Sequence, residues 1–171
     1  SITAHEFFHI VTPLNIHSEE IDDYDFMNPE MSAHLWLYEG CTEYAAQHVQ
    51  VKEGDMPFSQ FLKVMRRKMI NASSYDSGVA FTEVSKKALA QHADQYLNVY
   101  EQGALIGMAI DLELLDLSDG QYGIQNLMQD LAHEYGIDKP FKDDELFSEI
   151  GRVSGFSEME AFLEKYVGGT A

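Results

Sequence analysis

The chain has 171 residues, with 11 basic and 29 acidic side chains, which gives a formal net charge of −18. Nucleic acids and anionic membrane surfaces are not expected partners, because both are bound by basic surfaces. No segment approaches the ~20 consecutive apolar residues of a membrane span. Cys41 is the only cysteine, which excludes an internal disulfide. The length and a hydrophobic fraction of 45% indicate one folded domain with its own core.

Apolar residues recur at helical spacing along nearly the whole chain. The first helix is expected to end before Pro13, because the residue that precedes a proline is disfavoured in helical conformation. Ser157 and Glu160 match a capping box, which marks the start of the last helix. Helices are expected at about residues 2–11, 30–52, 57–72, 82–91, 97–117, 124–135, 144–153 and 157–167, and irregular chain at 13–29 and 71–78. Strand patterns are nearly absent, so the sequence predicts one mainly α domain.

The first helix carries the motif H-E-x-x-H, formed by His5, Glu6 and His9. Residues four apart lie on one face of a helix, so both imidazoles can bind one zinc ion. Glu6 lies one position round the helix from His5, where it can reach a water held by the metal rather than the metal itself. This is the general-base arrangement of zinc peptidases. A shuffled sequence of this composition would carry the motif roughly once in forty cases, so a helix with two ordinary histidines is the alternative.

A catalytic zinc ion needs a third protein ligand, and residues 35–44 (LWLYEGCTEY) offer two acids. Glu39 lies within an otherwise apolar stretch, where an unpaired carboxylate is costly to bury. Glu43 lies one helical turn further along the same face. From there it can accept the outer N–H of a ligating imidazole and fix the orientation of that ring. The alternative is that both acids form a solvated stripe on an amphipathic helix.

These segments together resemble the gluzincins, the thermolysin-related zinc peptidases whose ligands are two histidines and one glutamate. Within this group the chain is most similar to the glycyl aminopeptidase family. Residues 99–105 (VYEQGAL) and 110–112 (IDL) resemble the Y-x-K-G-A-L…L-D helix of that family, and residues 156–168 resemble the end of its peptidase domain. Gln102 departs from the pattern, because the family usually has lysine at this position.

The resemblance implies that the chain is the helical lobe of a thermolysin-like catalytic domain. Residues 1–168 would form this domain, truncated at its N-terminus, and residues 169–171 a tail. In the family, a β-rich region precedes the domain and a PDZ domain often follows it, so both are expected in the full-length chain. Periplasmic, secreted and cytoplasmic locations are all compatible with the resemblance.

The resemblance also implies a role for each motif residue. His5, His9 and Glu39 are expected to hold one zinc ion per chain, with Glu6 as the general base. Tyr100 is expected to donate a hydrogen bond to the oxyanion, which stabilises the transition state more than the ground state. The expected activity is zinc-dependent hydrolysis of peptide bonds, of the aminopeptidase type that removes small N-terminal residues from a peptide substrate.

Two alternatives stay open. The chain could be a non-catalytic helical fragment that binds metal weakly or not at all, or a helical interaction domain in which the motif is accidental. The remaining candidates are expected to be surface or packing residues: His17, His34, His48, His92 and His133, with His34 the nearest of them to the cleft, Cys41 in the core, and Arg66, Arg67 and Lys68 at a solvated helix end.

Overall fold

The computed structural model describes residues 2–27, 29 and 31–170. In chain order its elements are α1 (Ile2–Phe8), α2 (Glu19–Asp22), the π-helix η1 (Trp36–Cys41), α3 (Thr42–Lys52), α4 (Phe58–Ala72), α5 (Phe81–Lys86), the 3₁₀ helix η2 (Ala93–Gln95), α6 (Asn98–Leu117), α7 (Ile124–Glu134), the 3₁₀ helix η3 (Asp143–Glu145), α8 (Leu146–Ser154) and α9 (Glu158–Tyr166). Among the described residues, extended pairing is limited to two isolated β-bridges. The predicted mainly α fold is confirmed.

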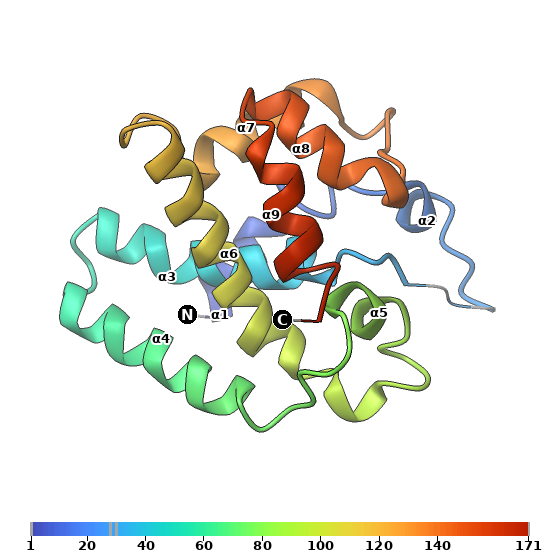
Figure 1. The fold of residues 1–171 in the computed structure, drawn as a ribbon, viewed down its shortest axis with the longest axis horizontal. Helices are drawn as coiled ribbons and strands as arrows, with labels where there is room; N and C mark the ends of the chain where they lie inside the picture. The colour runs from blue at the N-terminus through green and yellow to red at the C-terminus, as the bar shows by residue number, and fades with distance from the viewer. Residues whose placement is uncertain (1, 28, 30, 171) are drawn as a thin grey trace.

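Helix α6 lies at the centre of the molecule (Figure 1). It packs against η1, α3 and α4, and it also contacts α7 and α9. Its buried side chains include Val99, Ala104, Ile110 and Leu114, which explains why this segment is apolar on most of its faces. Helices α7, α8 and α9 pack together as a second group, and α1 packs on α3. The first helix is thereby held close to η1 and α6.

Helices η1 and α6 approach each other closely at Gly40 and Gly103. A Cβ atom on Gly40 would lie 2.4 Å from the Gly103 carbonyl carbon, and a Cβ atom on Gly103 would lie 2.9 Å from the Gly40 Cα. Carbon atoms in contact normally lie about 3.5–4.0 Å apart, so neither position accepts a side chain unless the backbone moves. This approach brings Glu39, which precedes Gly40, toward the start of α6.

The helix expected at residues 30–52 begins later, at Trp36, and its first part is a π-helix; residue 30 lies outside the described residues. Ser32 Oγ donates a hydrogen bond to Asp143 Oδ1, and the Ala33 backbone N–H donates to Asp143 Oδ2, both at 2.6 Å. Because these bonds to η3 hold residues 32 and 33, the chain does not enter the helix there. The predicted start was wrong, since a partner 110 residues away leaves no trace in local periodicity.

Other expected helices are present with changed ends. Those at 57–72, 97–117, 124–135 and 157–167 correspond to α4, α6, α7 and α9, whereas 2–11 ends at Phe8, 82–91 ends at Lys86, and 144–153 is divided between η3 and α8. The capping box at Ser157 was wrong. The backbone of Ser157 is already helical, with φ −62° and ψ −21°, and its side chain makes no capping hydrogen bond. A capping hydroxyl needs extended backbone at its own residue to reach the next turn.

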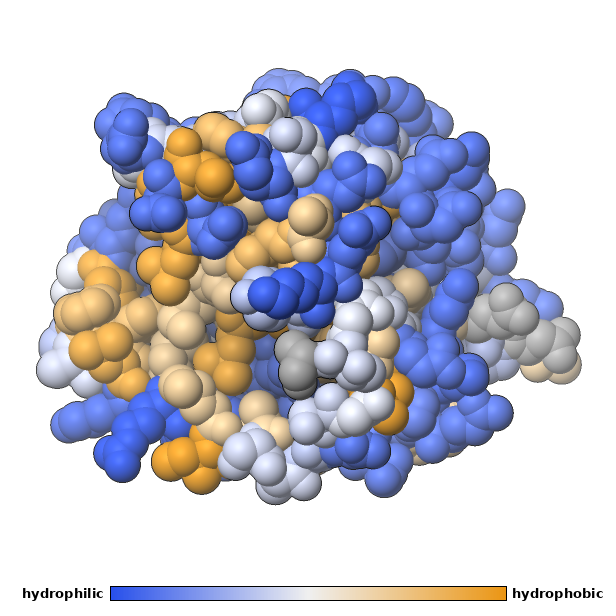
Figure 2. Space-filling model, in the orientation of Figure 1, coloured by the Kyte–Doolittle hydropathy of each residue, from blue (hydrophilic) through white to orange (hydrophobic). Residues whose placement is uncertain are grey.

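The face seen in Figure 2 has an apolar side and a polar side. Apolar residues gather where α4 and α6 lie, and Phe58, Leu62 and Leu112 of these helices are each more than half exposed. None of the described helices is long and apolar enough to cross a membrane.

Candidate active site

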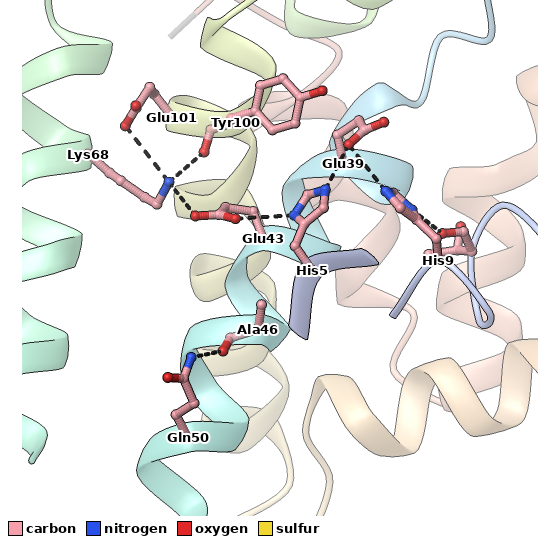
Figure 3. Close-up of polar contacts among 10 residues, drawn as sticks. His5, His9, Glu39, Glu43, Ala46, Gln50, Lys68, Tyr100 and Glu101 are labelled. Carbon is pink, nitrogen blue, oxygen red and sulfur yellow. Dashed lines mark hydrogen bonds and ion pairs between the residues drawn. The ribbon is translucent and has the colours of Figure 1, made fainter. Parts of the chain in front are cut away.

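A cavity of about 510 Å³ lies where α1, η1, α3 and the start of α6 meet. The side chains that line it are those of Ile2, His5, Glu6, His9, Glu39, Glu43, Gln47 and Tyr100. Apart from Ile2 and Gln47, these are the residues for which the sequence predicts a role. The structure therefore brings every predicted site residue to one cavity, from four different elements. Figure 3 shows how five of them lie relative to one another.

Three of these side chains converge on one point (Figure 3). His5 Nε2 lies 3.1 Å from Glu39 Oε2, and His9 Nε2 lies 3.6 Å from the same oxygen. One potential ligand atom from each of the three residues lies within 4.8 Å of the others. A tetrahedral zinc ion with bonds of about 2.0–2.1 Å places its ligand atoms about 3.3 Å apart. The two distances from the imidazole nitrogens to Glu39 Oε2 are close to this separation.

The outer nitrogens of both rings have partners that only accept hydrogen bonds. His5 Nδ1 lies 3.1 Å from Glu43 Oε2, and His9 Nδ1 lies 3.0 Å from the Thr12 carbonyl oxygen. A proton on each Nδ1 would satisfy these acceptors and would leave each Nε2 free to bind a metal ion. This donor set, two imidazoles and one carboxylate, is one that zinc binds.

Local helix geometry explains why these side chains meet. His5 lies on α1, whereas His9 lies in the turn directly after Phe8, so the helix expected to carry both histidines ends one residue before the second. Their ring centroids are still only 4.8 Å apart. His5 is buried at 8% exposure, whereas Phe7 on the other face is 66% exposed. Glu39 lies in the wider turn of the π-helix, a feature often found at functional sites. Glu43 follows in the first turn of α3, so that the two carboxylates contact opposite edges of the His5 ring.

Glu43 has a second partner that the sequence analysis missed. Lys68 Nζ on α4 lies 2.9 Å from Glu43 Oε1. The expectation of a solvated helix end at residues 66–68 was wrong for Lys68, which is only 5% exposed, although the two arginines before it are exposed. A signal existed in the sequence. Lys68 follows Met65 at helical spacing on the inward face of an amphipathic helix, where a lysine needs buried acceptors.

Tyr100 approaches the same centre from α6. Its ring centroid lies 5.9 Å from that of His5, and its hydroxyl lies 3.5 Å from the hydroxyl of Tyr96. Burial raises the pKa of the Tyr100 phenol well above its usual range, with further contributions from the Tyr96 hydroxyl and the Glu39 charge. The phenol therefore keeps its proton and can donate it in a hydrogen bond. Glu6 is exposed and lines the same cavity from α1.

His34 does not line this cavity, contrary to expectation. It is 2% exposed, and its Nδ1 accepts a hydrogen bond from Trp36 Nε1 at 3.0 Å. Its Nε2 then donates to the Asp143 carbonyl oxygen at 2.7 Å. Burial lowers the pKa of the His34 imidazole. His34 thus belongs to the hydrogen-bond network that holds the residues at the start of η1.

A larger cavity of about 700 Å³ lies on another side of α1, between α3 and α7. Most of its lining is apolar, and it includes Cys41 and His48 but none of the converging residues. Cys41 is buried, as expected of a packing residue, and burial raises the pKa of its thiol. A protonated buried thiol is a poor nucleophile, so Cys41 does not supply a nucleophile to the larger cavity.

The fold and this cluster define a helical domain with a candidate metal centre of the H-E-x-x-H type. The profile of the M61 glycyl aminopeptidase family matches residues 1–106, which is more than half of the chain. The chain belongs to this peptidase family. The predicted family is therefore confirmed.

The fold is shared with solved structures, one of which can be described. A crystal structure of an aminopeptidase N family protein from Idiomarina loihiensis is 22% identical in sequence and superposes with a TM-score of 0.87. The match covers 99% of this chain and 30% of that protein, so the chain spans less than a third of the length of this relative. No curated protein matches the sequence. At this identity the similarity shows the fold alone.

Proposed function

We propose that this chain is the helical part of a zinc-dependent peptidase, with His5, His9 and Glu39 holding one zinc ion. The observation that carries the proposal is the convergence of His5 Nε2 and His9 Nε2 on one oxygen of Glu39, while the outer nitrogen of each ring contacts a hydrogen-bond acceptor. Membership of a peptidase family supports the proposed activity. The position of Glu6 and Tyr100 at the same cavity supports hydrolysis rather than a purely structural metal site.

A zinc ion at these residues would supply Lewis acidity, which lowers the pKa of a bound water and polarises a substrate carbonyl. Glu6 would take the proton from the attacking water and pass it to the leaving amine. Tyr100, which stays protonated, would donate a hydrogen bond to the carbonyl oxygen as that oxygen gains negative charge. Glu43 would hold the His5 ring through its Nδ1–H.

The substrate class follows from the family. Its description as glycyl aminopeptidases favours a peptide substrate from which a small N-terminal residue, such as glycine or alanine, is removed. Since the chain spans only 30% of its structural relative, the activity is assigned to the full-length protein. A β-rich region before this domain and a PDZ domain after it are part of the proposal.

The substitution Glu6→Gln in the full-length protein tests the proposed mechanism. Zinc content should be unchanged, because Glu6 is not a proposed ligand. The rate of cleavage of a glycyl or alanyl chromogenic substrate should fall by about 10²–10⁴-fold, the usual contribution of a general base. Glu53→Gln, at an exposed acid that follows α3, is the matched control and should keep full activity.

The same assay separates the proposal from its alternatives. Full activity in the Glu6→Gln variant would rule out the general-base assignment. A wild-type protein without zinc and without activity would instead favour a non-catalytic helical domain. The isolated 171-residue chain, assayed beside the full-length protein, shows whether the helical domain cleaves peptides alone.

A further inference from the structure

Lys68 is the only lysine or arginine that is buried among the residues that the structure describes. Its position on α4 places it on the inward face with Phe61 and Met65. An ammonium group withdrawn from water is costly unless oxygen atoms surround it. The oxygen atoms that contact Lys68 therefore indicate the role of its buried charge.

The ammonium group of Lys68 contacts oxygens of two other helices. Nζ lies 2.9 Å from Glu43 Oε1 on α3, and it donates a hydrogen bond to the Tyr100 carbonyl oxygen on α6 at 3.0 Å. Glu101 Oε2, also on α6, lies 3.9 Å away. Two of these oxygens lie within hydrogen-bond distance of the ammonium, and the Glu101 carboxylate adds a negative charge further away. Both helices that Lys68 joins carry residues of the candidate active site.

These contacts form a continuous chain toward the ligands, as Figure 3 shows. Lys68 binds one oxygen of the Glu43 carboxylate, and the other oxygen contacts His5 Nδ1 at 3.1 Å. The opposite edge of the His5 ring faces Glu39. With both of its oxygens engaged, the Glu43 carboxylate cannot rotate freely about its own bond. The orientation of the His5 ring is fixed through it.

We propose that Lys68 is a positioning residue of the metal centre, which holds Glu43 in the orientation that aims His5 Nε2 at the ion. The proposal rests on the proposed zinc site. Through its bond to the Tyr100 carbonyl, the same ammonium also fixes the first turn of α6 relative to α3. One buried cation on α4 therefore sets the distance between a ligating ring and the proposed oxyanion donor.

A double-mutant cycle on zinc affinity tests this role. Zinc dissociation constants are measured by competition with a chromogenic chelator for the wild type, Lys68→Met, Glu43→Gln and the double variant. Loss of a group that orients a ligand typically weakens metal binding 10–100-fold, so each single variant should bind zinc at least about tenfold more weakly. The double variant should bind no more weakly than Glu43→Gln alone, because Lys68 acts through Glu43. Lys63→Met, at an exposed lysine of the same helix, is the control and should bind zinc as the wild type does.

A purely structural role gives a different pattern. In that case Lys68→Met would lower the melting temperature of the metal-free protein whether or not Glu43 is also replaced, and it would leave zinc affinity unchanged. That result would overturn the proposal. Additive losses of affinity in the double variant would also overturn it. If Lys68→Met does not fold, Lys68→Gln and Lys68→Arg replace it. The proposal is supported if Lys68→Gln binds zinc more weakly than the wild type and Lys68→Arg binds it as the wild type does. Equal zinc affinity in Lys68→Gln and Lys68→Arg contradicts it.

The wild-type measurement separates this inference from the proposed function. A wild type that binds no zinc overturns both. A wild type that binds zinc, with unchanged affinity in Lys68→Met, overturns only the role of Lys68.

Discussion

The substitution Gly40→Ala probes the contact that places Glu39 beside α6. A Cβ atom at residue 40 would lie 2.4 Å from the Gly103 carbonyl carbon and 2.6 Å from both the Gly103 Cα and its carbonyl oxygen. Normal carbon–carbon contacts are about 3.5–4.0 Å, so the overlap exceeds about 1 Å. All three atoms belong to the backbone, and no side chain can rotate away to relieve the overlap. The helices η1 and α6 must move apart.

The expected size of the effect follows from two opposing contributions. Overpacking of a core usually costs about 1–3 kcal/mol, and a clash with backbone alone places Gly40→Ala near the upper limit. The better helix propensity of alanine offsets up to about 1 kcal/mol. The net loss of stability is therefore about 2 kcal/mol, which lowers the melting temperature of a domain of this size by about 4–8 °C.

Thermal unfolding followed by circular dichroism measures this loss, and Gly151→Ala provides the control. Gly151 lies within α8, and a Cβ atom there would meet its nearest neighbours at an ordinary 3.6 Å. Gly151→Ala should therefore be neutral or stabilising by about 0.5–1 kcal/mol. If Gly40→Ala melts at or above the temperature of the wild type, the close approach of η1 and α6 is not as described. Its zinc affinity should also be lower, since Glu39 moves with η1.

Three further predictions concern single side chains. Tyr44→Phe should lower the free energy of unfolding in urea by about 1–3 kcal/mol, because it leaves the buried Asp111 Oδ2 without the 2.6 Å hydrogen bond from the Tyr44 hydroxyl; an unchanged midpoint would refute this. His34 has a lowered pKa in the folded protein, so below its ordinary value of 6.5 the unfolded chain binds a proton that the folded chain does not. Stability should thus fall as the pH is lowered from about 7 to about 5, and less steeply in His34→Gln; equal slopes would contradict the assignment. Tyr100→Phe should reduce kcat of the full-length protein by about 10²–10³-fold with unchanged zinc content, as for loss of an oxyanion donor, and an unchanged kcat would exclude that role.

The candidate site was largely predictable from sequence because its geometry is local. Two histidines four residues apart in a helical segment lie on one face, and His5 and His9 keep this arrangement although α1 ends at Phe8. The segment with Glu39 and Glu43 could be recognised because acids are rare in apolar stretches. Which atoms meet could not be predicted, because this depends on the π-helical turn and on the contact between Gly40 and Gly103, and neither is visible in periodicity.

Features that depend on distant residues were missed or misplaced. Lys68 lies in a run of basic residues, and its burial follows from acceptors on α3 and α6 that are 25 and 32 positions away. The late start of η1 depends on Asp143, and the place of His34 depends on the same residue. Helix ends set only by local signals, such as those of α4 and α6, were predicted within one or two residues.

The central claim is that His5, His9 and Glu39 hold one metal ion, and metal content tests it most directly. The protein is purified, dialysed against a metal-free buffer and analysed by mass spectrometry of the intact folded chain. The wild type should retain about one zinc ion per chain, as expected for three protein ligands, and Glu39→Gln should retain far less. A wild type without zinc, or a Glu39→Gln variant that holds zinc as tightly as the wild type, would contradict the claim.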